Sequence, residues 1–186
     1  SLERSLYLTT QLAELGIPVV LAINMMDEVE KSGETIDSDE LGKAFGIQVV
    51  KISALRETQI DELANVAEAT ARRKGHMMPV HRFSGGVEHA LGHIEEVALH
   101  DQPEYRQRWY AVKLFERNEL VEAELGISKE LKAHIEQDIR QCELEYDDDS
   151  DGIIAAERYD FVEKVLAKVT KLKKAGDLSA SDRIDR

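Results

Sequence analysis

Cysteine, proline and aromatic residues are scarce in this chain of 186 residues, and each shortage excludes a class of protein. The single cysteine, Cys142, rules out an internal disulfide and fits a reducing compartment. Aromatic residues make up 5%, too few for the stacking surfaces that bind single-stranded nucleic acid. No apolar run approaches the roughly 18–20 residues needed to cross a bilayer, so the sequence predicts no membrane-spanning segment within it.

Basic residues are also outnumbered, since 24 Lys and Arg face 37 Asp and Glu for a formal net charge of −13. Binding to a phosphate backbone depends on cationic side chains, so this charge predicts no nucleic-acid partner. Apolar residues make up 42% and charged residues 33%. This balance predicts a packed core rather than a disordered chain.

The first 74 residues alternate between helical and strand patterns. Leucines recur at helical spacing before a stop at Gly16: Leu2, Leu6, Leu8, Leu12 and Leu15. The apolar run Val19–Ile23 is typical of a strand that is buried on both faces of a parallel sheet. We expect a second strand at 49–52 and helices at 37–45, capped by Asp37 or Ser38 and ended by Gly46, and at 59–73. The alternation predicts an α/β domain.

From residue 75 the strand patterns stop and helical ones continue. We expect helices at about 87–100, 104–117, 128–145 and 153–173. The last contains a core-facing stripe: Ala155, Tyr159, Val162, Leu166 and Val169. Residues 75–173 are therefore predicted to form an all-helical domain, followed by a tether at 174–186.

Asn24-Met25-Met26-Asp27 follows the first strand, at the edge where α/β folds bind ligands. The Asp27 carboxylate can accept two parallel hydrogen bonds from guanine, a pattern that adenine does not offer, and the Asn24 amide can join neighbouring loops. The alternative is an ordinary strand-to-loop turn. The second strand ends in Ser53-Ala54-Leu55, and in guanine-nucleotide-binding proteins a Ser-Ala there closes over the same base. Together the two motifs predict a guanine site.

Two further patterns resemble metal-binding sites, but each has a more ordinary explanation. His89, His93 and His100 fall on one face of the expected helix with Glu96, which favours a solvated surface or, as the alternative, a weak divalent-metal site. The acidic run at 147–152 imitates the start of a calcium-binding loop, but Arg158 stands where the bidentate glutamate belongs. We expect these carboxylates to lie at the N-terminus of the next helix instead.

Several stretches together resemble the cytosolic region of the ferrous iron transport protein B (FeoB) family: LERSLYLTTQL (2–12), GIPVV through NMMD (16–27), SA (53–54), RWYAVKL (108–114), RYDFV (158–162) and SDRIDR (181–186). Met25 departs from the lysine usual in GTPases but is typical of this family. The resemblance implies the C-terminal part of a Ras-like P-loop GTPase sheet at residues 1–74, which holds the guanine-specificity half. It also implies a helical domain at 75–173 and a tether to a membrane helix at 174–186.

The family implies GTP-regulated uptake of Fe²⁺ and slow GTP hydrolysis with Mg²⁺, at the cytoplasmic side of a bacterial inner membrane. The partner would be the transmembrane region of the same polypeptide. The sequence contains no G-x-x-x-x-G-K-[ST], and its two D-x-x-G matches, at 39–42 and 149–152, do not follow an expected strand as the switch next to the γ-phosphate would. We therefore expect no catalytic residue in this chain, weak or no binding of GTP or GDP, and self-association through an incomplete sheet.

Two alternatives remain at this point. The chain is either a stand-alone helical interaction module with a vestigial nucleotide pocket, or an unrelated doubly wound binding domain whose N-x-x-D is a coincidence.

Overall fold

The computed structural model describes residues 1–24, 33–73 and 75–172. The chain divides into two compact units: residues 1–18 with 75–163, and residues 19–74 with 164–186. Compactness thus groups the first helix with the helical part of the chain, whereas the sequence pattern placed a boundary at residue 74. The expected tether at 174–186 lies outside the described residues.

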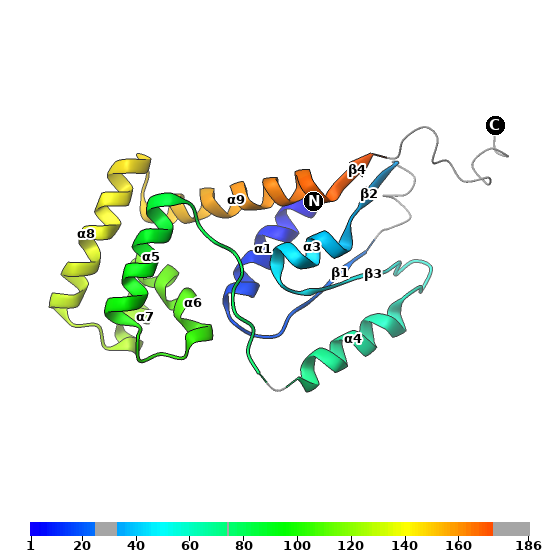
Figure 1. Ribbon diagram of the computed structural model, residues 1–186, viewed down its shortest axis with the longest axis horizontal. Coiled ribbons are helices and arrows are strands. Elements are labelled where there is room, and N and C mark those ends of the chain that lie inside the picture. The colour runs from blue at the N-terminus through cyan, green and yellow to red at the C-terminus, as the bar shows by residue number, and fades with distance from the viewer. Residues whose placement is uncertain (25–32, 74, 173–186) are drawn as a thin grey trace. The chain divides into compact units, whose positions relative to one another are not determined.

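The first unit is helical, and four of its helices gather into a bundle (α5 to α8 in Figure 1). Its helices are α1 (Leu2–Glu14), α5 (Gly85–Ala98), α6 (Glu104–Phe115), α7 (Glu119–Leu125), α8 (Lys129–Tyr146) and the first part of α9 (Ser150–Val169). Helix α7 was not expected, because seven residues are too few to repeat an apolar stripe. Its boundary signals are nevertheless present: Asn118 caps the Val121 N–H at 3.0 Å, and Gly126 ends the helix in the left-handed conformation.

The core of the bundle consists of aliphatic and aromatic side chains, most of them from α5, α6 and α8 and some from α7 and α9. Leu91, Ile94 and Phe115 are fully buried, and Ile139 is nearly so. Cys142 is buried among them, and burial raises the pKa of its thiol to about 11. This cysteine is therefore a packing residue, as expected.

Helix α1 buries Leu6 but not all of the leucines that revealed it in the sequence. Leu8 is 55% exposed and Leu12 39% exposed, whereas the buried residues are Leu6, Thr9, Thr10 and Glu14. The buried threonine hydroxyls donate to backbone oxygens one turn earlier, so they are satisfied within the helix. The helix predicted from the leucine periodicity is confirmed, whereas the buried face is made of Leu6 and polar residues.

Glu14 lies on this buried face and pairs with Arg158 of α9. The Arg158 Nη2 and Nε atoms lie 2.7 Å and 3.3 Å from the Glu14 carboxylate oxygens, and the two side chains are 2% and 4% exposed. Burial raises the pKa of Glu14, and the adjacent guanidinium opposes that rise. The buried face of α9 runs through Ile154, Arg158 and Val162, so the expected stripe is wrong at Tyr159, which is 45% exposed.

The segment 75–84 is extended and packs within the first unit. The Met77 N–H donates to the Gly16 carbonyl at 3.1 Å, and a Cβ at Gly16 would collide with the backbone oxygen of Tyr105. His81 is buried between the rings of Phe83 and Phe161, at centroid distances of 4.6 Å and 4.1 Å. Its Nδ1 has no hydrogen-bond partner, and burial lowers the pKa of this imidazole to about 4.

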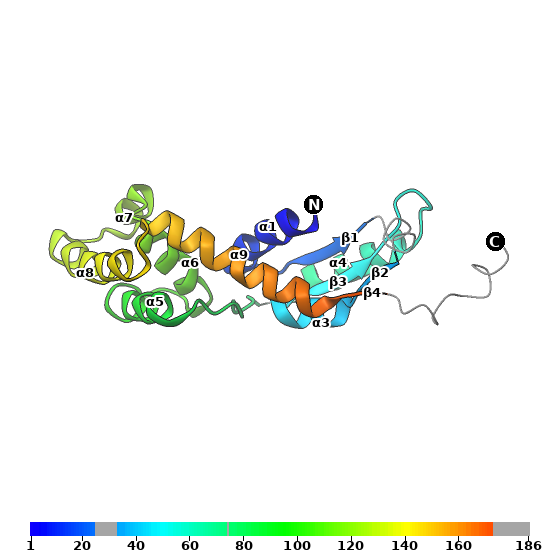
Figure 2. The same ribbon diagram turned by 90° about the horizontal axis from the view of Figure 1, so that it is seen from above.

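The second unit contains two parallel strands, β1 (Val20–Ile23) and β3 (Gln48–Lys51), with Val20 opposite Gln48. Helix α4 (Ile60–Arg72) lies under both strands and α3 (Ser38–Phe45) flanks β3 (Figures 1 and 2). The α/β prediction is confirmed, and so are the cap at Asp37 and the stop at Gly46.

A second, antiparallel pair of strands corrects the sequence prediction. The helix expected to reach residue 173 ends at Val169, and β4 (Thr170–Leu172) follows it and pairs with β2 (Glu34–Ile36). Strands therefore do not stop at residue 75. Each of these strands has three residues, too few for an alternating pattern to be visible in the sequence.

Strand β1 is less buried than its apolar run predicted. Ile23 is buried, Val20 and Leu21 are half-buried, and Ala22 is exposed. Helix α4 contains no buried residue. A parallel sheet is buried only when helices cover both of its faces, and the described elements do not provide that cover.

Removal of the Arg158 guanidinium should destabilise the first unit strongly, because Glu14 would remain buried without its partner. We expect Arg158→Ala to lower the free energy of unfolding by about 3–5 kcal/mol in urea titrations. Arg140→Ala is the control, since Arg140 is 73% exposed and also pairs with a glutamate, and it should cost well under ~1 kcal/mol. Equal effects of the two substitutions would contradict this role of the buried pair.

The buried His81 should make stability depend on pH. Its pKa is depressed, so its contribution is complete above about pH 6.5 and is lost as the pH falls through about 4. A shift of this size is worth about 3 kcal/mol between these limits. His81→Phe should remove that part of the acid sensitivity in urea titrations at pH 7 and pH 4, whereas His100→Phe, at an exposed histidine, should keep it. An unchanged pH dependence in His81→Phe would refute the prediction.

Candidate functional site

The candidate site lies where the two parallel strands end. Strand β1 ends at Ile23 and β3 at Lys51, and parallel pairing brings both carboxyl ends to one edge of the sheet. The Ile52 N–H donates to the Ile23 carbonyl at 2.8 Å, which extends the pairing by one residue. Asn24 and Ser53 therefore leave the sheet side by side.

The Asn24 side chain joins the two loops. Its Oδ1 accepts a hydrogen bond from the Ala54 N–H at 3.0 Å, across 30 residues of sequence. The amide thus makes the loop-to-loop link that its position after the strand suggested. The bond places the start of the N-x-x-D segment directly against the Ser-Ala segment.

The loop after β3 is closed by its own hydrogen bonds. Ser53 and Thr58 exchange backbone hydrogen bonds of 3.3 Å and 3.1 Å, and the Ser53 hydroxyl accepts from the Arg56 N–H at 3.3 Å. Glu57 and Gln59 take positive φ angles that turn the chain into α4. Ser53 is buried at 4% exposure, whereas Leu55 is 89% exposed. The loop is therefore held in shape from within and presents Leu55 to solvent.

The structure brings together three of the seven residues predicted for the guanine site: Asn24, Ser53 and Ala54. Leu55 follows them in the same loop. Met25, Met26 and Asp27 lie outside the described residues, so their place in a guanine site stays a prediction. The structure therefore shows the carboxyl ends of β1 and β3 side by side, with the Asn24 side chain held between the two loops by its hydrogen bond to Ala54.

The histidine pattern is only partly retained. His89, His93 and Glu96 lie on α5, but the helix ends at Ala98, so His100 does not share their face. His93 Nδ1 lies 2.6 Å from the Asp138 carboxylate of α8. Within residues 1–24, 33–73 and 75–172, no group of three or more His, Cys, Asp or Glu side chains is placed to hold a metal ion.

The acidic loop at 147–152 behaves as expected of helix-capping carboxylates. The Gly152 N–H donates to Asp149 Oδ1 at 2.8 Å in the first turn of α9. The Asp149 N–H donates to Asp148 Oδ1 at 2.8 Å. These bonds satisfy donors at the N-terminus of the helix, where negative charge is also favoured.

Arg117 forms a polar cluster that sequence reasoning missed. It occupies the turn after α6 with φ of 56°, and its guanidinium bonds to Glu136 and Glu143 of α8 and to the Ser150 hydroxyl. These bonds, first those to Glu143, raise the pKa of Arg117 above its usual value. No motif marks this arginine, because its partners lie 19, 26 and 33 residues away.

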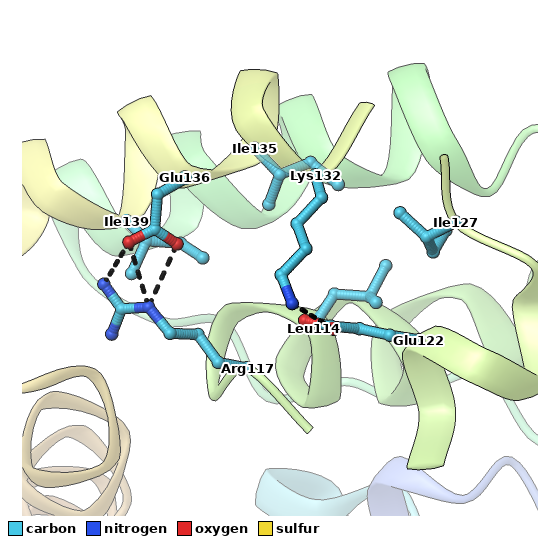
Figure 3. Close-up of a pocket in the computed structure, with 8 residues that line it drawn as sticks. All are labelled: Leu114, Arg117, Glu122, Ile127, Lys132, Ile135, Glu136 and Ile139. Atoms are coloured by element: carbon cyan, nitrogen blue, oxygen red, sulfur yellow. Dashed lines mark hydrogen bonds and ion pairs between the residues drawn. The ribbon is translucent and has the colours of Figure 1, made fainter. Parts of the chain in front are cut away.

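The cavity beside Arg117 is too small for a ligand. Figure 3 shows two ion pairs, Arg117–Glu136 and Lys132–Glu122, flanking apolar side chains from α6 and α8. The enclosed space is about 10 Å³, room for about one water molecule. The cluster therefore fastens α8 to the turn after α6 rather than forming a binding site.

Hydropathy adds one observation about membranes. Among the described residues, every helix is too short or too polar to span a bilayer.

Two family models match the chain over most of its length. The model for ferrous iron transport protein B covers residues 1–67, and the model for the FeoB cytosolic helical domain covers residues 83–171. The Fe(2+) transporter FeoB of Escherichia coli (strain K12) is 30% identical over 148 residues, which are 80% of this chain and 18% of the transporter. A fusion of Fe(2+) transport protein A with the Fe(2+) transporter FeoB, from Porphyromonas gingivalis, is 56% identical over 50 residues, which are 27% of this chain and 6% of that protein.

Solved structures match as well. A mutant S. thermophilus NFeoB bound to GDP has a TM-score of 0.81 and 38% identity, and the match covers 91% of this chain and 65% of that one. NFeoB from S. thermophilus bound to GDP.AlF4⁻ and K⁺ has a TM-score of 0.76 and 40% identity over 89% of this chain and 64% of that one. The chain thus spans about two thirds of these solved chains and less than a fifth of the transporters' length.

Proposed function

Because this chain belongs to the FeoB family of ferrous iron transport proteins, we propose that its α/β unit recognises the guanine base of GTP or GDP. The observation that carries the proposal is the hydrogen bond from the Ala54 N–H to the Asn24 side chain. It holds the two strand-end loops together at the sheet edge where nucleotides bind in α/β folds.

Base recognition in this proposal is divided between the two loops. Asp27 accepts the paired hydrogen bonds of the guanine edge, and adenine is rejected because it cannot supply them. Asn24 fixes the distance between the loops, and the loop from Ser53 to Leu55 closes over the base. Met25 and Met26 stand in sequence between Asn24, which links the loops, and Asp27, which binds the base.

Phosphate binding and hydrolysis belong to other residues of the parent protein. The 186 residues contain no glycine-rich phosphate loop, and the two D-x-x-G matches lie within α3 and at the start of α9 rather than in a loop that follows a strand. The triphosphate and Mg²⁺ contacts that normally drive phosphoryl transfer therefore have no partner in this sequence. We assign no catalytic role to any residue of this chain.

The wider role follows from the relatives, which are named as Fe(2+) transporters. We propose that the helical unit passes the nucleotide state to a transmembrane region of the same polypeptide, which carries ferrous iron. The parent would then work at the cytoplasmic side of a bacterial inner membrane, with GTP or GDP and Mg²⁺ bound to its nucleotide domain.

Guanine recognition can be tested on the chain itself by NMR titration with GTP and ATP. Guanine contacts alone are worth about 4 kcal/mol, so we expect GTP to bind at roughly 1 mM and ATP more weakly. The shifted signals should be those of Asn24 and of the loop from Ser53 to Leu55. No phosphate release should occur.

Three variants sharpen this titration. Asp27→Ala and Asn24→Ala should lose the preference for GTP, whereas Asp39→Ala, at an exposed carboxylate of α3 in the same unit, should retain it. A chain without base preference would instead support an interaction module with a vestigial pocket. Micromolar binding of GTP would show that phosphate contacts are present after all.

We also propose that the chain self-associates through β1. Among the described residues this strand pairs only with β3, and Ala22 on it is exposed. An unpaired strand edge is a template for pairing with a second chain. Light scattering should therefore give a mass above 21.0 kDa that rises with concentration. Ala22→Lys should lower that mass, and Leu120→Lys, at an 83% exposed position of α7, should not. A monomer at every concentration would exclude the proposal.

A further inference from the structure

An open groove runs between α5 and α8 in the first unit, apart from the residues assigned to guanine. Its volume is about 390 Å³. Carboxylates and imidazoles dominate its lining: Glu88, His89, Gly92, His93, Glu96 and Asp138. Glu88 is already engaged, because both of its carboxylate oxygens accept from Arg108.

His93 is held in one orientation by Asp138. The distance from its Nδ1 to Asp138 Oδ2 is 2.6 Å, and the two side chains are 31% and 27% exposed. An ionised carboxylate can only accept, so Nδ1 carries the hydrogen, and Nε2 is the ring nitrogen left to face a metal ion. A histidine whose second nitrogen donates to a carboxylate is the usual form of a metal ligand in proteins.

His89 supplies a second imidazole on the same face. It lies four residues before His93 on α5, which places the two rings one turn apart, the spacing of helical zinc-binding histidines. Gly92 lies between them along the groove, and nothing would meet a side chain there within 4 Å. The space in front of the two imidazoles is therefore open.

We propose that this groove binds a divalent transition-metal ion through Nε2 of His93 and a ring nitrogen of His89. Asp138 orients His93 from behind, and water completes the coordination. Two imidazoles favour borderline ions such as Zn²⁺ over Mg²⁺ and Ca²⁺, which prefer oxygen ligands. With two protein ligands the site exchanges its ion readily, and it binds more weakly than a four-ligand structural zinc site.

Calorimetry with Zn²⁺ alone on the tag-free chain tests the site. We expect one Zn²⁺ per chain and no heat with Mg²⁺. His93→Ala and His89→Ala should each weaken Zn²⁺ binding by at least about tenfold. His100→Ala is the matched control, since His100 is exposed but lies beyond the end of α5, and it should bind Zn²⁺ like the parent.

Asp138→Asn separates the orienting role from the ligands. It should weaken Zn²⁺ binding by about tenfold. Zn²⁺ should also raise the melting temperature of the parent by mass action, and this shift should vanish in His89→Ala. His89 is exposed, and its replacement leaves the pair between His93 and Asp138 intact. The lost shift in melting temperature would therefore report lost Zn²⁺ binding and not a folding defect.

Three outcomes would overturn the proposal. The first is parent-like Zn²⁺ binding in both His89→Ala and His93→Ala, which would indicate diffuse attraction to an acidic surface. The second is a loss in His100→Ala as large as that in His93→Ala. The third is weaker Zn²⁺ binding in His134→Ala but not in His89→Ala. The second ligand would then be His134, whose ring centroid lies 5.1 Å from that of His93.

Discussion

The first unit depends on the buried ion pair between Glu14 and Arg158, which joins α1 to α9 across 144 residues of sequence. Neither charge has water to solvate it, so each holds the other in place and the loss of either leaves an unpaired buried charge. Aromatic packing surrounds the pair, since the Arg158 guanidinium lies 6.0 Å from the Tyr7 ring centroid and Tyr7 packs on Tyr159 at 4.5 Å. The pair helps to tie α1 to the helical unit, together with contacts between α1 and α6, although β1 follows α1 directly in sequence.

The two units hold their candidate site residues in place by different interactions. In the α/β unit, parallel pairing aligns two strand ends and one amide, that of Asn24, joins the loops that leave them. In the helical unit, carboxylates hold basic side chains in place: Asp138 orients His93, and two glutamates bind the guanidinium of Arg117. Some of the many carboxylates of the chain therefore lie inside the fold, where they bind buried or half-buried basic side chains.

Much of the local structure could be predicted from sequence because its causes are local. Asp37 and Gly46 delimit α3 by capping and by a left-handed turn, and both were readable from residue type and spacing. The Asn24 link was also foreseeable, because the amide follows a strand at the sheet edge where neighbouring loops meet. The short strands β2 and β4 were not, since three residues show no periodicity and they pair across more than 130 residues.

The sequence by itself determined where the longer helices and the strands β1 and β3 form, because periodicity and capping act within a few residues. Only the tertiary structure decided which face is buried. Leu8 and Leu12 share a face that nothing in the first unit covers, while Glu14 is buried because Arg158 reaches it from a helix distant in sequence. The same holds for His93, whose partner Asp138 is 45 residues away. Burial and pairing depend on which elements meet, and that information does not lie in local spacing.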